Sequence, residues 1–201
     1  MASWKKYCPD YEIIEWNESN YDVSKNKYMY EAYKAKKWGF VPDYARLDVI
    51  YEHGGIYLDT DVELIDTLDD LLYQKGFAGF ESRNYVNFGS GFGAEKHNEL
   101  IKDLRDFYDT RTFRKDDNSL DLTASPRLQT EKLLKKGLKQ NGEYQVIDGF
   151  TIFPEKVLCG MSEVTRRIKT CNYTRAIHHY DGSWLTEEQK KLLSKKNALF
   201  K

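Results

Sequence analysis

Two carboxylates, Asp59 and Asp61, follow one short apolar segment of this 201-residue chain. Residues two apart on an extended strand point the same way, so both side chains should face one point. Carboxylate oxygens suit Mg²⁺ or Mn²⁺. In open α/β folds, ligands sit outside the carboxyl ends of strands, where this pair falls. We therefore predict a divalent-cation site with Asp61 as its first ligand. A solvated acidic turn is the alternative.

A helix and a strand must position this pair. Pro42 suits a helix start, and Gly54–Gly55 suits its end, where a positive φ is needed. On a helix over 43–53, Asp43 and Arg46 share the arc of the apolar residues, which should face the protein. Burying these two charges is costly unless they pair with each other or meet a ligand. The sequence therefore predicts a polar site beside the helix.

These residues together resemble a known family. The order D-x-x-R, an apolar run and G-G-I-Y-L-D-x-D resembles the sugar-binding region of the DXD-containing glycosyltransferases, which form glycosyltransferase family 32. It is similar also to the glucosyltransferase domains of large clostridial toxins. The match is sharpest over Val41 to Leu64. Such a run is far more specific than the Asp pair alone.

Weaker matches occur further along the chain. The segment from Ala176 to Trp184 resembles the H-H-x-x-G-S-W signature of the same family. In related transferases, a His three residues before a Gly is a metal ligand, which implies His179. The segments 87–93 and 123–126 resemble the family's N-x-x-x-G and T-G-P motifs, although Ser125 replaces the usual Gly.

The resemblance implies roles for the site residues. Asp61, Asp59 and His179 would hold Mn²⁺ or Mg²⁺, and Asp59 would alternatively bind the ribose of the donor. Asp43 and Arg46 would hold the hydroxyls of the donor sugar, and Arg46 would also meet the phosphates through bidentate bonds. Asp59, Asp61 and Arg46 are the expected catalytic set. A structural i, i+3 ion pair is the competing interpretation of Asp43 and Arg46.

Two further roles are less specific. Trp184 would close over the diphosphate or the sugar, whereas the alternative is a core Trp with its N–H satisfied. Asn87 would face the acceptor, and its alternative is a turn Asn. For His178 and His179 the alternative is a surface pair.

The implied activity is metal-dependent, retaining transfer of a hexose from a nucleotide-diphosphate sugar. UDP and GDP donors share the diphosphate, so the sequence leaves both open. The acceptor would be a glycan or lipid-linked saccharide in bacterial polysaccharide or capsule synthesis. A truncated or non-catalytic relative that binds a nucleotide sugar or a partner chain is the alternative. A metal-dependent phosphate hydrolase is less favoured, because a two-metal site requires more ligands than the one acidic pair found here.

Alternating elements indicate an α/β fold. Helices are expected over 24–38, 43–53, 97–108 and 127–137, and strands over 11–16, 56–59, 77–80, 88–92, 144–147 and 151–153. With the resemblance, this implies one GT-A-like domain over 1–201, with a mixed, mostly parallel sheet flanked by helices. The sequence opens at Met1 to Trp4 inside what is expected to be the first helix, so the sheet is expected to lack the family's first strand. The edge left unpaired would invite pairing with another chain, including a second copy in a homodimer.

The composition of the chain also bears on nucleic-acid binding, redox environment and membrane association. The net charge of −1 gives no electrostatic footprint for nucleic acid. The three cysteines show no C-x-x-C spacing, which favours a reducing cytoplasm. The sequence contains no run of 18 apolar residues, which is the length that a membrane-spanning helix needs. A basic helix over 186–201 is expected to present a solvated face, and contact with the inner face of an anionic membrane is the alternative.

Overall fold

The structure is a computed structural model that describes residues 1–162, 165–182 and 188. Its α-helices are α1 (Ala2–Tyr7), α2 (Lys27–Lys34), α3 (Pro42–His53), α4 (Glu99–Asp109), α5 (Ser125–Lys135) and α6 (Glu155–Leu158). Its strands are β1 (Gly55–Tyr57), β2 (Val62–Leu64), β3 (Gly76–Phe80), β4 (Val86–Asn87), β5 (Phe92–Ala94), β6 (Gln145–Ile147), β7 (Phe150–Phe153) and β8 (Ala176–His178). Short 3₁₀ turns lie at Val23–Lys25 and Asp69–Leu71.

The larger sheet is mixed, with strand order β1-β5-β3-β7-β6 and with β4 paired to β3. The α/β prediction and the mixed, GT-A-like sheet are therefore confirmed. The expectation of a mostly parallel sheet is wrong, because among the described strands only β3 and β7 pair in parallel. Residues 81–85 and 88–91 link β3, β4 and β5. These links are too short for the crossover that parallel neighbours require.

The strand directions bring three carboxyl ends to one edge of the sheet. β1 and β3 both run antiparallel to β5, so they point the same way, and β7 is parallel to β3. Asp59 follows β1, Glu81 follows β3 and Pro154 follows β7. Segments far apart in the sequence therefore meet where α/β folds bind ligands.

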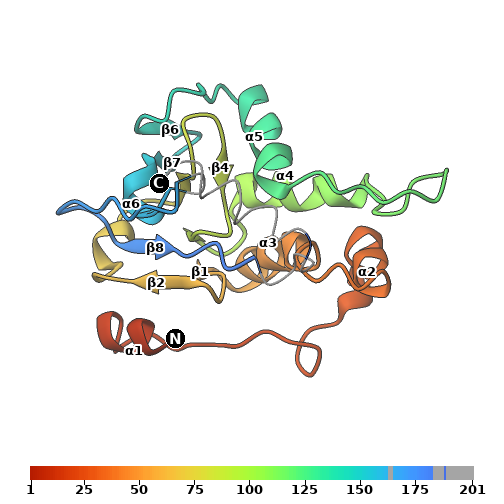
Figure 1. The fold of residues 1–201 in the computed structure, drawn as a ribbon, viewed down its shortest axis with the longest axis horizontal. Helices are drawn as coiled ribbons and strands as arrows, with labels where there is room; N and C mark the ends of the chain where they lie inside the picture. The colour runs from red at the N-terminus through yellow and green to blue at the C-terminus, as the bar shows by residue number, and fades with distance from the viewer. Residues whose placement is uncertain (163–164, 183–187, 189–201) are drawn as a thin grey trace.

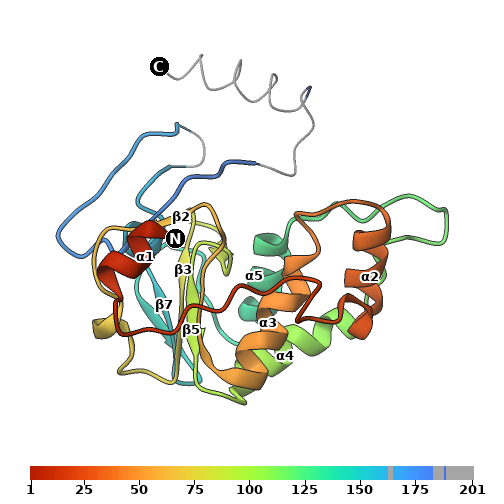
Figure 2. The ribbon, with the colours of Figure 1, turned by 90° about the horizontal axis from the view of Figure 1, so that it is seen from below.

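Helices α2 to α5 gather on one side of the strands (Figure 1 and Figure 2). Helix α3 packs against α4 and β1. The core between helices and sheet includes Leu47, Phe80, Phe92 and Tyr108, each with essentially no exposed surface. Burying a side chain of this size stabilises the fold by about 1.5–3 kcal/mol. The core thus fixes α3 rigidly against the start of β1.

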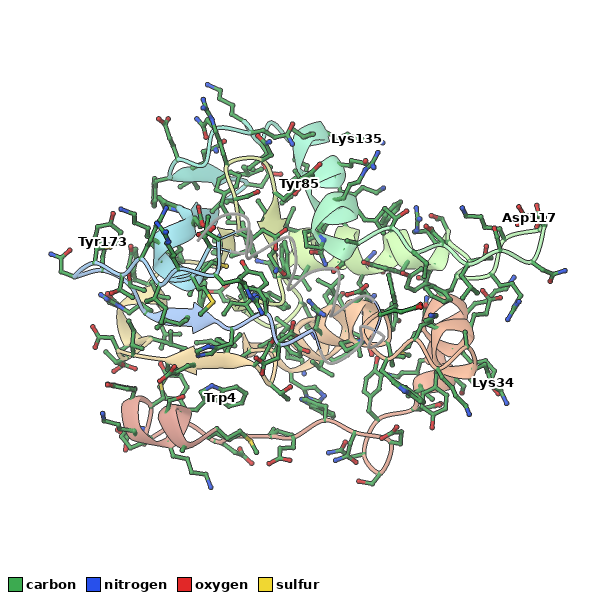
Figure 3. All side chains as sticks on the ribbon, in the orientation of Figure 1. Trp4, Lys34, Tyr85, Asp117, Lys135 and Tyr173 are labelled. Carbon is green, nitrogen blue, oxygen red and sulfur yellow. The ribbon has the colours of Figure 1, made fainter. Side chains whose placement is uncertain are left out.

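Strands β2 and β8 form a separate antiparallel sheet in which Val62 lies opposite His178. Helix α1 covers the free edge of β2, and Trp4 lies between the two (Figure 3). The Nε1–H of Trp4 donates to the carbonyl of Val62 over 2.8 Å. The amide of Leu64 donates to Oγ of Ser3 over 3.2 Å. Side chains of α1 therefore satisfy backbone groups that a free strand edge would leave unpaired.

Several element boundaries differ from the expected ones. The helix expected over 24–38 is a 3₁₀ turn followed by the shorter α2, and 11–16 is not a strand. The segment expected as one strand over 88–92 contains the loop between β4 and β5. Trp184 and, apart from residue 188, the helix expected over 186–201 lie outside the described residues. Within the part of the chain that is described, no helix is long and apolar enough to cross a membrane.

Candidate metal and donor site

Helix α3 places Asp43 and Arg46 inside the protein, at 2% and 4% exposure. Pro42 occupies the first turn of the helix, and Gly54 ends it at φ 72°. A Cβ on Gly54 would lie 2.9 Å from the backbone nitrogen of Lys96, so both space and conformation require glycine there. These two boundary residues set the helix so that its charged arc meets the end of β1.

Arg46 joins two carboxylates. Its Nη2 lies 3.2 Å from Oδ1 of Asp43 and 3.6 Å from Oδ1 of Asp59, and its Nε–H donates to the carbonyl of Pro42 over 3.1 Å. Burial alone would lower the pKa of Arg46, but Asp59, Tyr57 and Asp43 outweigh it and raise the pKa. The guanidinium is therefore held charged and oriented.

For Asp43, the effect of burial on the pKa outweighs the effect of the neighbouring charge. Burial raises its pKa to about 6, although Arg46 and a hydrogen bond from Ser125 lower it. The i, i+3 ion pair that was the competing interpretation is present. It does not exclude a role for the pair toward a ligand, since Arg46 also reaches Asp59.

Tyr57 belongs to the site and was missed by the sequence analysis. Its hydroxyl donates to Oδ1 of Asp59 over 2.8 Å, and the guanidinium carbon of Arg46 lies 5.4 Å from its ring centroid. Burial, reinforced by Asp59, raises the pKa of Tyr57 well above its usual value. The signal was available, because Tyr57 precedes Asp59 by two residues and therefore shares its face of an extended chain.

Asp61 accepts hydrogen bonds from segments that lie far away in the sequence. Nε2 of His178 lies 3.2 Å from its Oδ1, and the amide of Asp181 donates to its Oδ2 over 3.0 Å. Burial alone would raise the pKa of Asp61, but the bond and charge of His178 and the backbone amides outweigh it and lower the pKa. The carboxylate form is thereby favoured, which is the form that binds cations.

The structure places the two histidines on different partners. His178 is buried, and its ring packs on Tyr180 with centroids 4.1 Å apart. Nδ1 of His178 is buried without a hydrogen-bond partner. Nε2 of His179 instead lies 2.8 Å from Oε2 of Glu63, on a more exposed face. The family spacing favoured His179 as the ligand, whereas the geometry brings His178 to Asp61.

Asp59, Asp61 and His178 form a group that fits a divalent cation. Each offers one ligand atom, and these atoms all lie within 4.8 Å of one another. Two carboxylates and one imidazole suit Mn²⁺, which accepts both oxygen and nitrogen ligands. The buried, unpartnered nitrogen of His178 shows that this ring is not fully satisfied by the protein.

Asn87 lies beside this group, but its side chain is engaged within the protein. Its Nδ2–H donates to Oε2 of Glu81 over 2.8 Å, and its Oδ1 accepts from the amide of Gly89 over 2.6 Å. Asn87 is 6% exposed. The expected contact of Asn87 with an acceptor therefore remains a prediction, and Glu81 and Gly89 are neighbours that sequence reasoning did not identify.

With this geometry established, comparison with known proteins adds one finding. Residues 1–78 match the family model described as the glycosyltransferase sugar-binding region containing the DXD motif. The match supports a glycosyltransferase family. No curated protein and no solved structure matches the chain significantly.

The matched region contains Asp43, Arg46, Asp59 and Asp61, whereas His178 lies beyond it. A glycosyl-transfer function, a nucleotide-sugar donor and a divalent metal are the properties that this family typically carries. The part of the site outside the match rests on geometry alone.

Proposed function

We propose that this chain is a metal-dependent, retaining glycosyltransferase of family 32 that moves a hexose from a nucleotide-diphosphate sugar. The observation that carries the proposal is the convergence of Asp59, Asp61 and His178 beside the buried Arg46. It supports a cation and a sugar at adjacent points on one edge of the sheet.

Each residue has a definite part in this proposal. A divalent cation held by Asp59, Asp61 and His178 would act as a Lewis acid toward the diphosphate leaving group. Arg46 would orient the donor, because its planar guanidinium presents several donors in fixed directions. Asp43 keeps that guanidinium in place and would accept a hydrogen bond from a sugar hydroxyl. Tyr57 fixes one oxygen of Asp59, which leaves the other oxygen for the cation or the ribose.

Retention of anomeric configuration, the acceptor and the location belong to the same proposal. The acceptor is a glycan or lipid-linked saccharide of bacterial polysaccharide or capsule synthesis, and transfer takes place in the cytoplasm, at the inner face of the membrane. The sequence resemblance supports retention and the acceptor, whereas the cysteine spacing and the basic segment 186–201 support the location. The stereochemistry of an isolated product, determined by NMR, would test retention directly.

The first experiment is a thermal-shift screen of UDP- and GDP-sugars with and without Mn²⁺. Nucleotide sugars that stabilise the protein are then tested in donor-hydrolysis and transfer assays. A ligand that binds only the folded state stabilises it according to its concentration relative to its Kd. We expect a Mn²⁺-dependent shift with one donor class and release of the nucleoside diphosphate. Binding without release would favour the non-catalytic alternative. Absence of any Mn²⁺-dependent shift would contradict both.

A further inference from the structure

A chain of hydrogen bonds joins Glu81 to the cation site. The amide of Asp59 donates to the carbonyl of Gly89 over 3.1 Å. The amide of Gly89 donates to Oδ1 of Asn87 over 2.6 Å, and Nδ2 of Asn87 donates to Oε2 of Glu81 over 2.8 Å. The chain of hydrogen bonds thus runs from the residue after β3, through the end of β4 and the following loop, to Asp59, two residues beyond the end of β1.

The backbone of Gly89 lies so close to the site that no side chain would fit there. A Cβ there would overlap Oδ2 of Asp59, lie 2.7 Å from Nη1 of Arg46 and lie 3.0 Å from Oδ1 of Asn87. The backbone of Gly89 therefore forms one wall of the space in which Asp59 and Arg46 meet. A shift of this backbone toward the site would therefore displace the Asp59 carboxylate, the Arg46 guanidinium or both.

The orientation of the Asn87 amide decides where that wall lies. An Asn side chain has an accepting oxygen and a donating NH₂ group of nearly the same shape, so its orientation depends on its partners. Only the oxygen can accept from the amide of Gly89. A carboxylate at Glu81 accepts and does not donate, so it selects the orientation in which NH₂ faces Glu81 and oxygen faces Gly89. Because the acceptor is a carboxylate, this bond is charge-assisted and stronger than a neutral one.

We propose that Glu81 is a positioning residue for the cation site: it fixes Asn87, which fixes Gly89, which sets Asp59 against Arg46. This inference rests on the proposed function, because it assumes that Asp59 and Asp61 hold a divalent cation. Glu81 itself is half-buried and does not belong to the group of ligand atoms. Its effect is therefore on the affinity of the site and on its geometry, not on a contact with the ion.

The test is a titration of the 201-residue chain with Mn²⁺ alone, monitored by electron paramagnetic resonance. We expect Glu81→Ala to raise the Kd for Mn²⁺ about tenfold, at the lower end of what losing an outer-shell partner costs. Glu81→Gln keeps an accepting oxygen, so most of the affinity should return. Glu143→Ala is the matched control, because Glu143 accepts from Nδ2 of Asn141 over 3.0 Å on the surface. This control should leave the Kd unchanged.

A double-mutant cycle tests the chain as a unit. If Glu81 acts through Asn87, the variant carrying both Glu81→Ala and Asn87→Ala should lose no more Mn²⁺ affinity than Asn87→Ala alone. Additive losses would overturn the inference. So would a Kd for folded Glu81→Ala equal to that of the unmodified protein.

A further variant, Glu81→Asp, tests the inference if Glu81→Ala does not fold. Should Glu81→Ala not fold, Glu81→Asp keeps the carboxylate but draws it back, and its Kd should rise about threefold, a smaller loss than that of the missing partner. An unchanged Kd in Glu81→Asp would then overturn the inference. Failure of the proposed function would look different, because the unmodified protein itself would bind no Mn²⁺.

Discussion

The two halves of the site are built in opposite ways. The half formed by α3 and β1, called the α3–β1 half, consists of Asp43, Arg46, Tyr57 and Asp59. The half formed by β2 and β8, called the β2–β8 half, consists of Asp61, His178 and the amide of Asp181. The first comes from one short stretch of chain and is held by buried charges. The second joins Asp61 to an amide 120 residues away through a small two-stranded sheet.

Because of this difference, mutations in the α3–β1 half should act mainly on stability, and mutations in the β2–β8 half mainly on metal affinity. Removing a charge from the α3–β1 half leaves its buried partner uncompensated, so the fold itself should suffer. In the β2–β8 half, Asp61 is part-exposed, at 20% of its side chain, so the protein should tolerate its loss better. We expect changes in this half to act mainly on the cation.

Asp61→Asn should give the largest effect and should leave the protein folded. We expect Mn²⁺-dependent donor turnover to fall roughly a thousandfold, because the leaving group loses several kcal/mol of stabilisation by the cation. Steady-state turnover and the Tm of both proteins should be measured side by side. Undiminished turnover in folded Asp61→Asn would refute the metal assignment.

Arg46→Met should act on stability instead. It leaves Asp43 and Asp59 without their shared partner, so the free energy of unfolding should fall by about 3–5 kcal/mol. Arg127→Met is the control, since Arg127 pairs with Glu131 on an exposed helix face and should lose less than about 1 kcal/mol. Urea unfolding of both variants measures the difference. Equal losses would mean that the buried pair has no special weight.

His178→Ala and His179→Ala sharpen the assignment within the β2–β8 half. We expect His178→Ala to raise the Mn²⁺ concentration for half-maximal turnover by at least about tenfold, because losing a direct ligand should cost no less than losing an outer-shell partner. His179→Ala removes the contact with Glu63 on a more exposed face and should change that concentration less than about twofold. Metal titrations corrected for the folded fraction decide between them. A selective effect of His179→Ala would restore the assignment based on family spacing.

The pH dependence of stability should differ in sign between the halves. The pKa of Asp43 is raised from 3.8 to about 6, so the folded protein binds this proton more tightly than the unfolded chain. Its contribution to the free energy of unfolding therefore falls as pH rises from about 4 to about 6. The pKa of Asp61 is lowered, so its contribution is present above the ordinary pKa and is lost as pH falls.

Unfolding curves of Asp43→Asn and Asp61→Asn between pH 3 and 7, each subtracted from that of the unmodified protein, isolate these two contributions. We expect opposite slopes, which is the smallest of the four effects. Slopes of the same sign would show that the two carboxylates do not have the contrasting environments described above.

The sequence predicted Asp43, Arg46 and Asp59 of the α3–β1 half because their determinants are local. Pro42 and Gly54 mark the helix, and the spacing of Asp43 and Arg46 places them on its buried arc. The β2–β8 half could not be predicted in the same way. Alternation along an extended segment shows that His178 and His179 face opposite sides, but not which side meets Asp61. That choice depends on the register between β2 and β8, which is a non-local pairing.

The sheet illustrates the same limit. The sequence located most strands of the larger sheet to within a few residues. The parallel arrangement was inferred from the fold class, although the short links between Phe80 and Phe92 already require antiparallel neighbours. Glu81 was missed because its contact with Asn87 forms only when β3 and β4 pair. Tyr57 was missed although its partner Asp59 lies only two residues along the chain.

The bond from the indole of Trp4 to the carbonyl of Val62 has a practical consequence. Val62 directly follows Asp61, so the ring reports on backbone next to the cation site. Mn²⁺ is paramagnetic, and its binding should therefore quench the fluorescence of Trp4. A protein in which Trp16, Trp38 and Trp184 are replaced by Phe would keep Trp4 as its single tryptophan, whose fluorescence would then report metal occupancy.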